Sequence, residues 1–403
     1  MKILMLTPYL PYPPSSGGQI RSYNLIKYLS KRHEITLFSL VKNKDEEAHI
    51  KELRPYCREV SVFFRPEKPW TLSNILKTGF SLNPFLVVRN MATEEKKKIA
   101  EKLGKEKFDL IHAETFYVMP HLPKNSTPVI LVDQTIEFEV YRHFVETMKW
   151  RILRPLLSID IFKLKHCETK FWRQANRVVA VSEADRKVMR ACVPGLRVDI
   201  IPNAPGEDLV GLYEKKPPPD LKKPIIFFPS NFLWMQNVEG AEILAKKVFP
   251  LIKKKNPAAV CRIVGQYAAK KIGHLSGEGI EIIDIDASDI ESVWNAYLSA
   301  TVFVAPLWGP GGTRLKILGA MAAGVPVVTT SVGIEGIDAS PEKNVLVSDD
   351  YEKMADYVDL LLKNPVFYKK IVTAARELIE KKYRWEKIAG DLEKIYEEIK
   401  NGN

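Results

Sequence analysis

Short apolar runs rich in β-branched residues alternate with amphipathic stretches along most of the chain. The amphipathic stretches include residues 21–30 and 184–192, whose spacing predicts helices. Strands that alternate with helices form parallel sheets covered by helices on both faces, so we predict a doubly wound α/β architecture. The runs that predict strands are 2–6, 34–40, 60–64, 110–112, 129–132, 177–181, 198–201, 225–228, 260–264, 280–283, 302–305, 325–329 and 345–347.

One stretch, residues 206–224, breaks this alternation with prolines and charged side chains. The alternation restarts at Ile225, and roughly the last 50 residues read as helical. We therefore predict two Rossmann-like domains facing across a cleft. The predicted divisions are an N-terminal domain at 1–205, a linker at 206–224, a C-terminal domain at 225–382 and a terminal helix at 383–403 that could pack back on the N-terminal domain.

The segment 302–329 carries the clearest chemical signal. It reads as a strand, a glycine loop, a helix and a second strand. A glycine loop that opens a helix directly after a strand exposes backbone N–H groups at the positive helix end, which is a ready anion site. Positive side chains add to it, so we predict phosphate binding by Gly311, Gly312, Thr313 and at least one of Arg314 and Lys316; the alternative is that both of these cations are solvated surface residues.

Bulk properties agree with an enzyme that handles anions. The 403 residues carry a net charge of +11, which favours anionic partners such as nucleotides or phospholipid headgroups. A charged fraction of 27% and a hydrophobic fraction of 46% are ordinary for a globular enzyme. Four scattered cysteines indicate reduced thiols, and neither a membrane-spanning run nor a signal-peptide core is recognisable, so we expect a cytoplasmic protein.

A series of motifs resembles glycosyltransferase family 4, whose members have the GT-B fold. The N-terminal motifs are Gly17-Gly18 with Arg21 and Asn24, Phe108-Asp-Leu-Ile-His-Ala-Glu114, Val132-Asp-Gln-Thr-Ile-Glu137, Ala175–Asp185 and Ile201-Pro-Asn203. The C-terminal motifs are Pro229–Asn237, Ile263-Val-Gly265 and the block 305–328, which is of the Gly-Thr-Arg-Leu-Lys subtype.

The resemblance implies a division of labour between the domains. The second domain would bind a UDP- or GDP-linked sugar, and the first a glycan or lipid-linked acceptor. The reaction would be a retaining, hexosyltransferase-type transfer in polysaccharide biosynthesis, without a metal or other cofactor. Fixed cations at the diphosphate would accelerate it, because negative charge grows on the leaving phosphate as the glycosidic bond weakens.

The chain departs from the family at the nucleotide site. Family 4 typically has two glutamates eight positions apart, and the second holds the nucleotide ribose; here Gly311 and Gly319 occupy those positions. Glu335 is the nearest acidic substitute, as a ribose or sugar contact or as a solvated loop carboxylate. Gly319 keeps two further readings open, which are a catalytically impaired protein that binds a partner and a sugar-nucleotide epimerase of the same fold.

Other candidates follow from strand ends, because carboxyl ends of parallel strands face the ligand crevice. In the first domain, His112 and Glu114 are either catalytic groups near the sugar or satisfied strand-end residues. The resemblance places Gly17 and Gly18 at the donor, and Asp133 and Gln134 are candidates for the acceptor pocket. In the second domain, Ser230, Asn231 and Gly265 are candidates for nucleotide-sugar binding.

Two further segments admit more than one interpretation. Asp284-Ile-Asp286 matches a metal-binding tripeptide, but it leads into Ser288-Asp-Ile-Glu291, which looks like a capped helix start, so we expect no metal site. Residues 141–177 are basic and aromatic. They predict either peripheral contact with an anionic membrane surface or a solvated helix pair with core aromatics; nucleic-acid binding is not expected.

Overall fold

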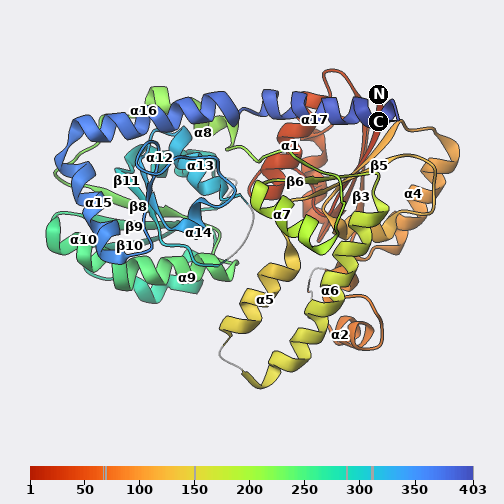
Figure 1. Ribbon diagram of the computed structural model, residues 1–403, viewed down its shortest axis with the longest axis horizontal. Helices are drawn as coiled ribbons and strands as arrows, with labels where there is room; N and C mark the ends of the chain where they lie inside the picture. The colour runs from red at the N-terminus through yellow and green to blue at the C-terminus, as the bar shows by residue number, and fades with distance from the viewer. Residues whose placement is uncertain (67, 69, 149–150, 287–288, 310–312, 403) are drawn as a thin grey trace. The chain divides into compact units, whose positions relative to one another are not determined.

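The computed structural model describes residues 1–403 except 67, 69, 149–150, 287–288, 310–312 and 403. The described chain divides into two compact units. The first unit comprises 1–202 and 385–402, and the second comprises 203–309 and 313–384. The C-terminal residues therefore belong to the same unit as the N-terminus, although the whole second unit separates them in sequence (Figure 1).

The first unit is built on a seven-stranded parallel sheet with the order β3-β2-β1-β4-β5-β6-β7. The central strands are buried on both faces, as expected for a sheet covered by helices. The strands are β1 (Lys2–Thr7), β2 (Glu34–Val41), β3 (Glu59–Phe64), β4 (Leu110–Glu114), β5 (Val129–Asp133), β6 (Arg177–Ala180) and β7 (Val198–Ile200).

Eight α-helices are described in this unit. The last of them, α17 (Trp385–Lys400), packs against α1 (Gly17–Leu29) and buries Ile388, Leu392 and Ile395 at helical spacing. Its Trp385 is almost fully buried, so the helix is part of this unit's core. The others are α2 (Leu72–Gly79), α3 (Phe85–Asn90), α4 (Thr93–Lys105), α5 (Glu137–Thr147), α6 (Arg154–Gln174) and α7 (Glu183–Cys192).

The second unit repeats this architecture with six parallel strands in the order β10-β9-β8-β11-β12-β13. Its strands are β8 (Ile225–Pro229), β9 (Val260–Gly265), β10 (Ile280–Asp284), β11 (Val302–Ala305), β12 (Val327–Thr329) and β13 (Leu346–Val347). The helices are α8 (Glu207–Gly211), α9 (Met235–Ile243), α10 (Phe249–Lys255), α11 (Ala268–Ile272), α12 (Ile290–Ser299), α13 (Leu315–Ala322), α14 (Ser331–Ile334), α15 (Tyr351–Lys363) and α16 (Pro365–Lys382).

The predicted fold class is confirmed, and the thirteen predicted strands are all present. Differences lie at element ends. The helix expected at 21–30 begins earlier, at Gly17, because Ser16 caps it. The strand expected at 325–329 begins at Val327, following Pro326, which has no N–H for a sheet hydrogen bond. The helix after Asp286 is capped by Asp289, which accepts from the Ser292 N–H at 3.0 Å; Ser288 lies outside the described residues.

Both sheets reverse their winding direction once, between β1 and β4 in the first unit and between β8 and β11 in the second. Ligands of open α/β sheets bind at the carboxyl ends of the strands that flank such a reversal. These two edges are therefore where a site is expected. Across the described residues, no helix combines the length and the apolar character needed to cross a bilayer.

Candidate functional site

In the second unit, the winding reversal brings the end of β8 beside the loop that follows β11. Ser230 directly follows β8, and Lys316 comes from the first turn of α13. The Lys316 ammonium donates to the Ser230 hydroxyl at 2.7 Å and to Asn237 Oδ1 at 2.5 Å. It also lies 4.8 Å from the centre of the Phe228 ring, a cation–π distance. Two predicted donor residues, Lys316 and Ser230, are thus in direct contact.

The charge of Lys316 is poorly compensated. Burial, followed by the nearby Arg314 guanidinium, holds the pKa of Lys316 well below its usual value. Among the described residues, no carboxylate forms an ion pair with it. The loop residues at 310–312 are proline and glycines, so they bring no acidic side chain either. A partly buried cation held only by neutral oxygens favours binding of an anion that supplies the missing charge.

The loop after β11 contains two more polar groups that bear on ligand binding. Trp308 Nε1 and Thr313 Oγ1 are buried and have no hydrogen-bond partner among the described residues. Such groups are rare in folded proteins and commonly mark a missing ligand or water. Arg314, the residue before α13, is 8% exposed and donates to the Gly309 carbonyl. The predicted phosphate ligands Gly311 and Gly312 lie outside the described residues.

Gly265 at the end of β9 and Asn231 in the loop after β8 support this corner. Gly265 has φ = +139°, and a Cβ there would lie 1.8 Å from the Ser230 carbonyl oxygen. Glycine is therefore required for β9 to pass close to Ser230. Asn231 donates to Gln266 Oε1 at 2.5 Å and accepts from the Asn237 amide through its carbonyl at 2.8 Å. These contacts fix the loop that presents Ser230 to Lys316.

The position of the missing ribose-binding glutamate is occupied by neighbouring side chains. A Cβ on Gly319 would lie 2.9 Å from Leu209 Cδ1 and 3.1 Å from the Tyr297 hydroxyl. Any larger side chain at this position must displace Leu209, which lies on α8. Glu335 is exposed and follows the short helix α14, and no described contact joins it to Lys316, Ser230 or Arg314. Its role as a substitute for the missing carboxylate stays a prediction.

In the first unit, His112 and Glu114 belong to a fully buried polar chain at the end of β4. Glu114 accepts from Arg21 Nε at 2.8 Å, and its other oxygen contacts His112 Nε2 at 2.5 Å. His112 Nδ1 contacts the Tyr396 hydroxyl of α17 at 2.5 Å. One tautomer satisfies all of these groups, with Nε2–H donating to Glu114 and the Tyr396 O–H donating to Nδ1.

The negative charge of Glu114 in this buried series of hydrogen-bonded side chains is balanced locally. Burial alone would raise the pKa of Glu114, but the Arg21 guanidinium and the His112 hydrogen bond outweigh it and leave the pKa below its usual value. Arg21 also donates to the Ile201 carbonyl at 3.1 Å. The arrangement supports a structural role that joins α1, β4 and α17, so a catalytic role for His112 and Glu114 stays a prediction.

The glycine loop of the first unit meets the same network. A Cβ on Gly18 would overlap the Tyr9 hydroxyl at 2.3 Å, so glycine permits this close packing, and Gly17 is the exposed first residue of α1. Gln134 donates to that hydroxyl at 3.0 Å and to Glu114 at 2.7 Å. The structure thus brings Gly18, Gln134 and Glu114 together. The sequence analysis did not single out Tyr9 or Tyr396, although Tyr396 extends the apolar spacing of α17.

Asp133 is buried at the end of β5, and its place in an acceptor pocket stays a prediction. It is 1% exposed and accepts from Trp172 Nε1 at 2.6 Å and from the Phe116 N–H at 3.3 Å. Burial raises its pKa to about 7. Glu168, also fully buried, accepts from the Glu137 and Phe138 N–H groups and so caps the start of α5. Within the described part of the chain, no group of His, Cys, Asp and Glu side chains is arranged to hold a metal ion.

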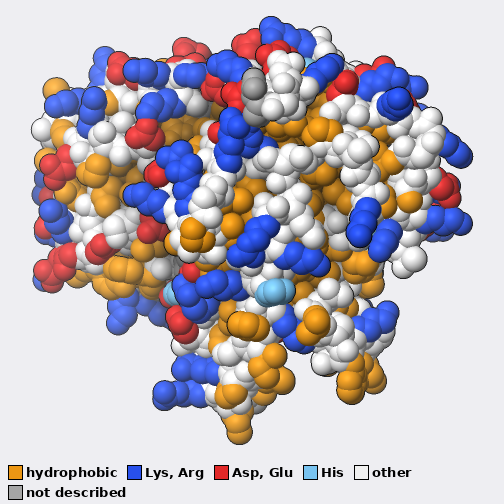
Figure 2. Space-filling model, turned by 45° about the vertical axis from the view of Figure 1, so that its right-hand side comes forward, with side chains coloured by type: hydrophobic (Ala, Val, Ile, Leu, Met, Phe, Trp, Pro, Cys, Tyr) orange, Lys and Arg blue, Asp and Glu red, His pale blue; other side chains and the backbone are white. Residues whose placement is uncertain are grey.

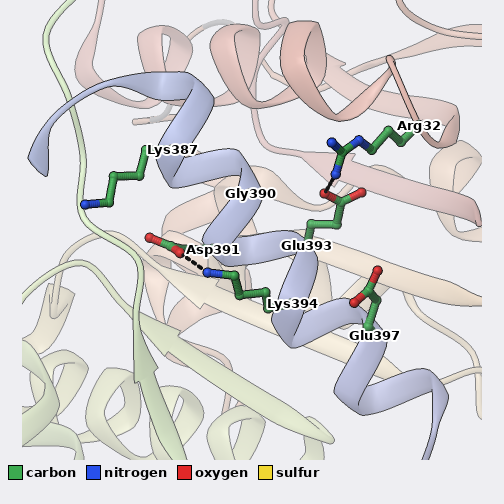
Figure 3. Close-up of a pocket in the computed structure, with 7 residues that line it drawn as sticks. All are labelled: Arg32, Lys387, Gly390, Asp391, Glu393, Lys394 and Glu397. Atoms are coloured by element: carbon green, nitrogen blue, oxygen red, sulfur yellow. Dashed lines mark hydrogen bonds and ion pairs between the residues drawn. The ribbon is translucent and has the colours of Figure 1, made fainter. Parts of the chain in front are cut away.

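A hollow of about 400 Å³ lies elsewhere in the first unit, along α17 and the end of α1 (Figure 3). Charged side chains line it, and most of them pair with one another. Glu393 accepts from Arg32 at 2.8 Å, and Lys394 donates to Asp391 at 2.8 Å. None of the predicted site residues lines this hollow, so it is not the candidate donor site.

Comparisons with known proteins agree with this architecture. A family model described as glycosyl transferases group 1 matches residues 223–364, and one described as glycosyltransferase family 4 matches residues 15–204. Sucrose-phosphate synthase from Thermosynechococcus elongatus superposes with a TM-score of 0.71 at 16% identity, over 100% of both chains. Anabaena Alr3699/HepE in complex with UDP-glucose superposes with a TM-score of 0.62 at 15% identity, over 98% of this chain and 99% of that one.

Two Rossmann-like units with these matches define a GT-B glycosyltransferase. Together the two family models span both units, and the chain belongs to the group 1 and family 4 glycosyltransferases. A curated relative from Klebsiella pneumoniae, described as an uncharacterized 44.6 kDa protein in the cps region, is 22% identical over 412 residues. That match covers 96% of this chain and 97% of the relative.

Proposed function

We propose that the second unit binds a UDP- or GDP-linked sugar and that the protein transfers this sugar to a glycan or lipid-linked acceptor in the cytoplasm. The observation that carries the proposal is Lys316, a poorly compensated cation at the carboxyl ends of β8 and β11. A diphosphate there would supply the missing negative charge and gain hydrogen bonds from Ser230 and Thr313. UDP-glucose bound to the HepE relative and the cps-region source of the curated relative support a role in polysaccharide synthesis.

The reaction that we propose retains the anomeric configuration. As the bond between sugar and diphosphate breaks, charge accumulates on the β-phosphate, and the interaction with Lys316 and Arg314 strengthens. The leaving phosphate then accepts the acceptor's proton, so no side-chain base is required. Because the cations come from the chain, activity should survive chelation of divalent metals.

The second candidate is a GT-B protein that is impaired in donor binding, and Leu209 and Tyr297 at the Gly319 position favour it. Without a carboxylate for the ribose, the site depends on the diphosphate contacts. In dinucleotide-binding folds the ribose hydroxyls donate hydrogen bonds to such a carboxylate. A sugar-nucleotide epimerase is a further alternative, and the assay described next distinguishes it from a transferase.

The test measures binding and hydrolysis of UDP- and GDP-sugars by the purified full chain, with and without EDTA. Saturable binding with slow hydrolysis that EDTA leaves unchanged would support the transferase. Epimerised donor without acceptor would favour the epimerase. No binding at millimolar donor would favour the impaired protein, and the transferase proposal would fail.

A further inference from the structure

Helix α2 in the first unit has its apolar side in solvent and its polar side inward. Leu72, Ile75 and Leu76 are 73%, 48% and 49% exposed, whereas Asn74 is 5% exposed. A surface helix normally shows the opposite pattern, with apolar residues against the core. The residues that flank α2 continue the exposed apolar surface; these are Trp70, Phe80 and Leu82.

The beginning of α6 and the turn before it have a second exposed apolar stripe. Leu156, Ile159 and Phe162 are 67%, 57% and 74% exposed and recur every three residues, with Ile152 and Leu153 exposed ahead of them. Farther along the same helix, Phe171 and Trp172 are buried in the core. Only the beginning of α6 therefore presents apolar side chains to solvent.

Hydrogen bonds hold these two surfaces together. Lys163 of α6 donates to the Thr78 and Ser81 carbonyls near the end of α2, both at 2.8 Å. Asp160 of α6 accepts from the Phe85 N–H at 3.0 Å, and Trp70 stacks on the Phe85 ring at 4.3 Å. We call the exposed apolar residues between 70 and 82 and between 152 and 162 the apolar tip. Figure 2 shows orange side chains at the ends of the two projections along the lower edge of the view.

The charge around the apolar tip is strongly one-sided. Residues 70–83 contain one lysine and no acidic residue, and residues 151–166 contain four Lys or Arg and one acidic residue. That acidic residue, Asp160, is used internally by the Phe85 N–H. Lys77 and Arg151 are exposed and form no ion pair with any described carboxylate. Interfaces between proteins are depleted in lysine, whereas anionic lipid surfaces attract it.

We propose that the apolar tip inserts into the interfacial region of a bilayer that contains anionic lipids, with Lys77 and Arg151 at the level of the headgroups. Apolar side chains gain free energy on leaving water, and neighbouring cations bind lipid phosphates. Docking through the apolar tip would hold the first unit, which we propose binds the acceptor, at a membrane that carries a lipid-linked acceptor. This docking does not depend on sugar transfer, so the two proposals can fail separately.

Flotation of the full chain with lipid vesicles tests the proposal without any sugar nucleotide. The wild type should bind vesicles that contain phosphatidylglycerol more tightly than vesicles of phosphatidylcholine alone, and salt should weaken the difference. Each basic residue near an anionic surface contributes roughly fivefold to affinity. The double variants Phe80→Ser with Leu82→Ser, and Leu156→Ser with Phe162→Ser, should each reduce binding by about tenfold or more.

The matched control is Val366→Ser, because Val366 is 80% exposed but belongs to the second unit. It should bind vesicles as the wild type does, and circular dichroism should show that all variants are folded. Trp70 fluorescence, isolated by comparison with Trp70→Phe, should shift to shorter wavelength on vesicle binding. Absence of vesicle binding, equal binding by the tip variants, or a wild-type dimer that the tip variants dissociate would each overturn membrane docking.

Discussion

Replacement of Lys316 by methionine separates donor binding from folding. Methionine keeps the length and apolar stem of the side chain but removes the ammonium that contacts Ser230 and Asn237. The charge that we assign to diphosphate binding is thereby lost, together with the contact between the ammonium and the Phe228 ring. The variant therefore tests whether the positive charge of Lys316 contributes to binding of the donor.

The expected loss of affinity follows from the type of contact. A hydrogen bond to a charged group contributes about 1.5–3 kcal/mol. Lys316→Met should therefore weaken UDP binding by roughly 10- to 150-fold. Isothermal titration calorimetry with UDP measures this directly, and it needs neither the sugar nor the acceptor to be known.

Stability supplies an independent signature with a definite sign. Because the pKa of Lys316 is lowered in the folded state, the unfolded chain binds more protons between that lowered pKa and the usual value of about 10.4. The contribution of Lys316 to the free energy of unfolding therefore rises with pH across this window. Lys316→Met lacks this contribution, so its stability relative to the wild type should fall as the pH is raised towards that usual value.

Lys216 provides the matched control, since it is a second lysine of the same unit with a lowered pKa. Its ammonium donates to the Tyr297, Leu298 and Ala300 carbonyls at 2.8, 3.0 and 2.8 Å, and burial lowers its pKa to about 8. Lys216→Met should destabilise the protein but leave UDP affinity unchanged. If Lys316→Met bound UDP like the wild type, or if both variants lost affinity equally, the electrostatic account of the donor site would be wrong.

Three further predictions test individual side chains. Gly319→Glu should lower the free energy of unfolding by about 1–3 kcal/mol through overpacking against Leu209. The added change Leu209→Ala should recover part of this loss, as measured by urea unfolding. If the effects of the two substitutions on the free energy of unfolding were strictly additive, the contact would be refuted. Glu95 has a pKa raised to about 8 by burial, so its own contribution to the free energy of unfolding should fall from about pH 4 to about pH 8, by up to ~1.4 kcal/mol per pH unit. The stability of Glu95→Gln relative to the wild type should therefore rise across this window, and a constant difference would refute the raised pKa. Tyr396→Phe should lower the free energy of unfolding by about 1–3 kcal/mol, because His112 Nδ1 loses its hydrogen-bond partner, and it should leave UDP binding intact. An unchanged melting temperature would contradict a stabilising role for the His112–Tyr396 hydrogen bond.

Much of the fold was predictable from local pattern. A run such as Val302–Ala305 is short, apolar and fully buried, as expected for a strand that helices cover on both faces. The alternation of such runs with helices then defined two parallel sheets. The sequence assigned Lys316 to the diphosphate and Ser230 to the nucleotide sugar as separate candidates, and the structure places their side chains in contact.

Long-range packing decided the rest. Tyr396 is 284 residues from His112, and no local pattern indicates that α17 completes the polar chain at the end of β4. Leu209 and Tyr297 fill the space beside Gly319 from two other elements of the second unit, so the reason for a glycine there was invisible in the sequence. The sequence alone determined which short segments form strands and helices, because the spacing of apolar residues along the chain is a local property. The tertiary structure alone determined which buried polar groups find partners, because those partners come from distant segments.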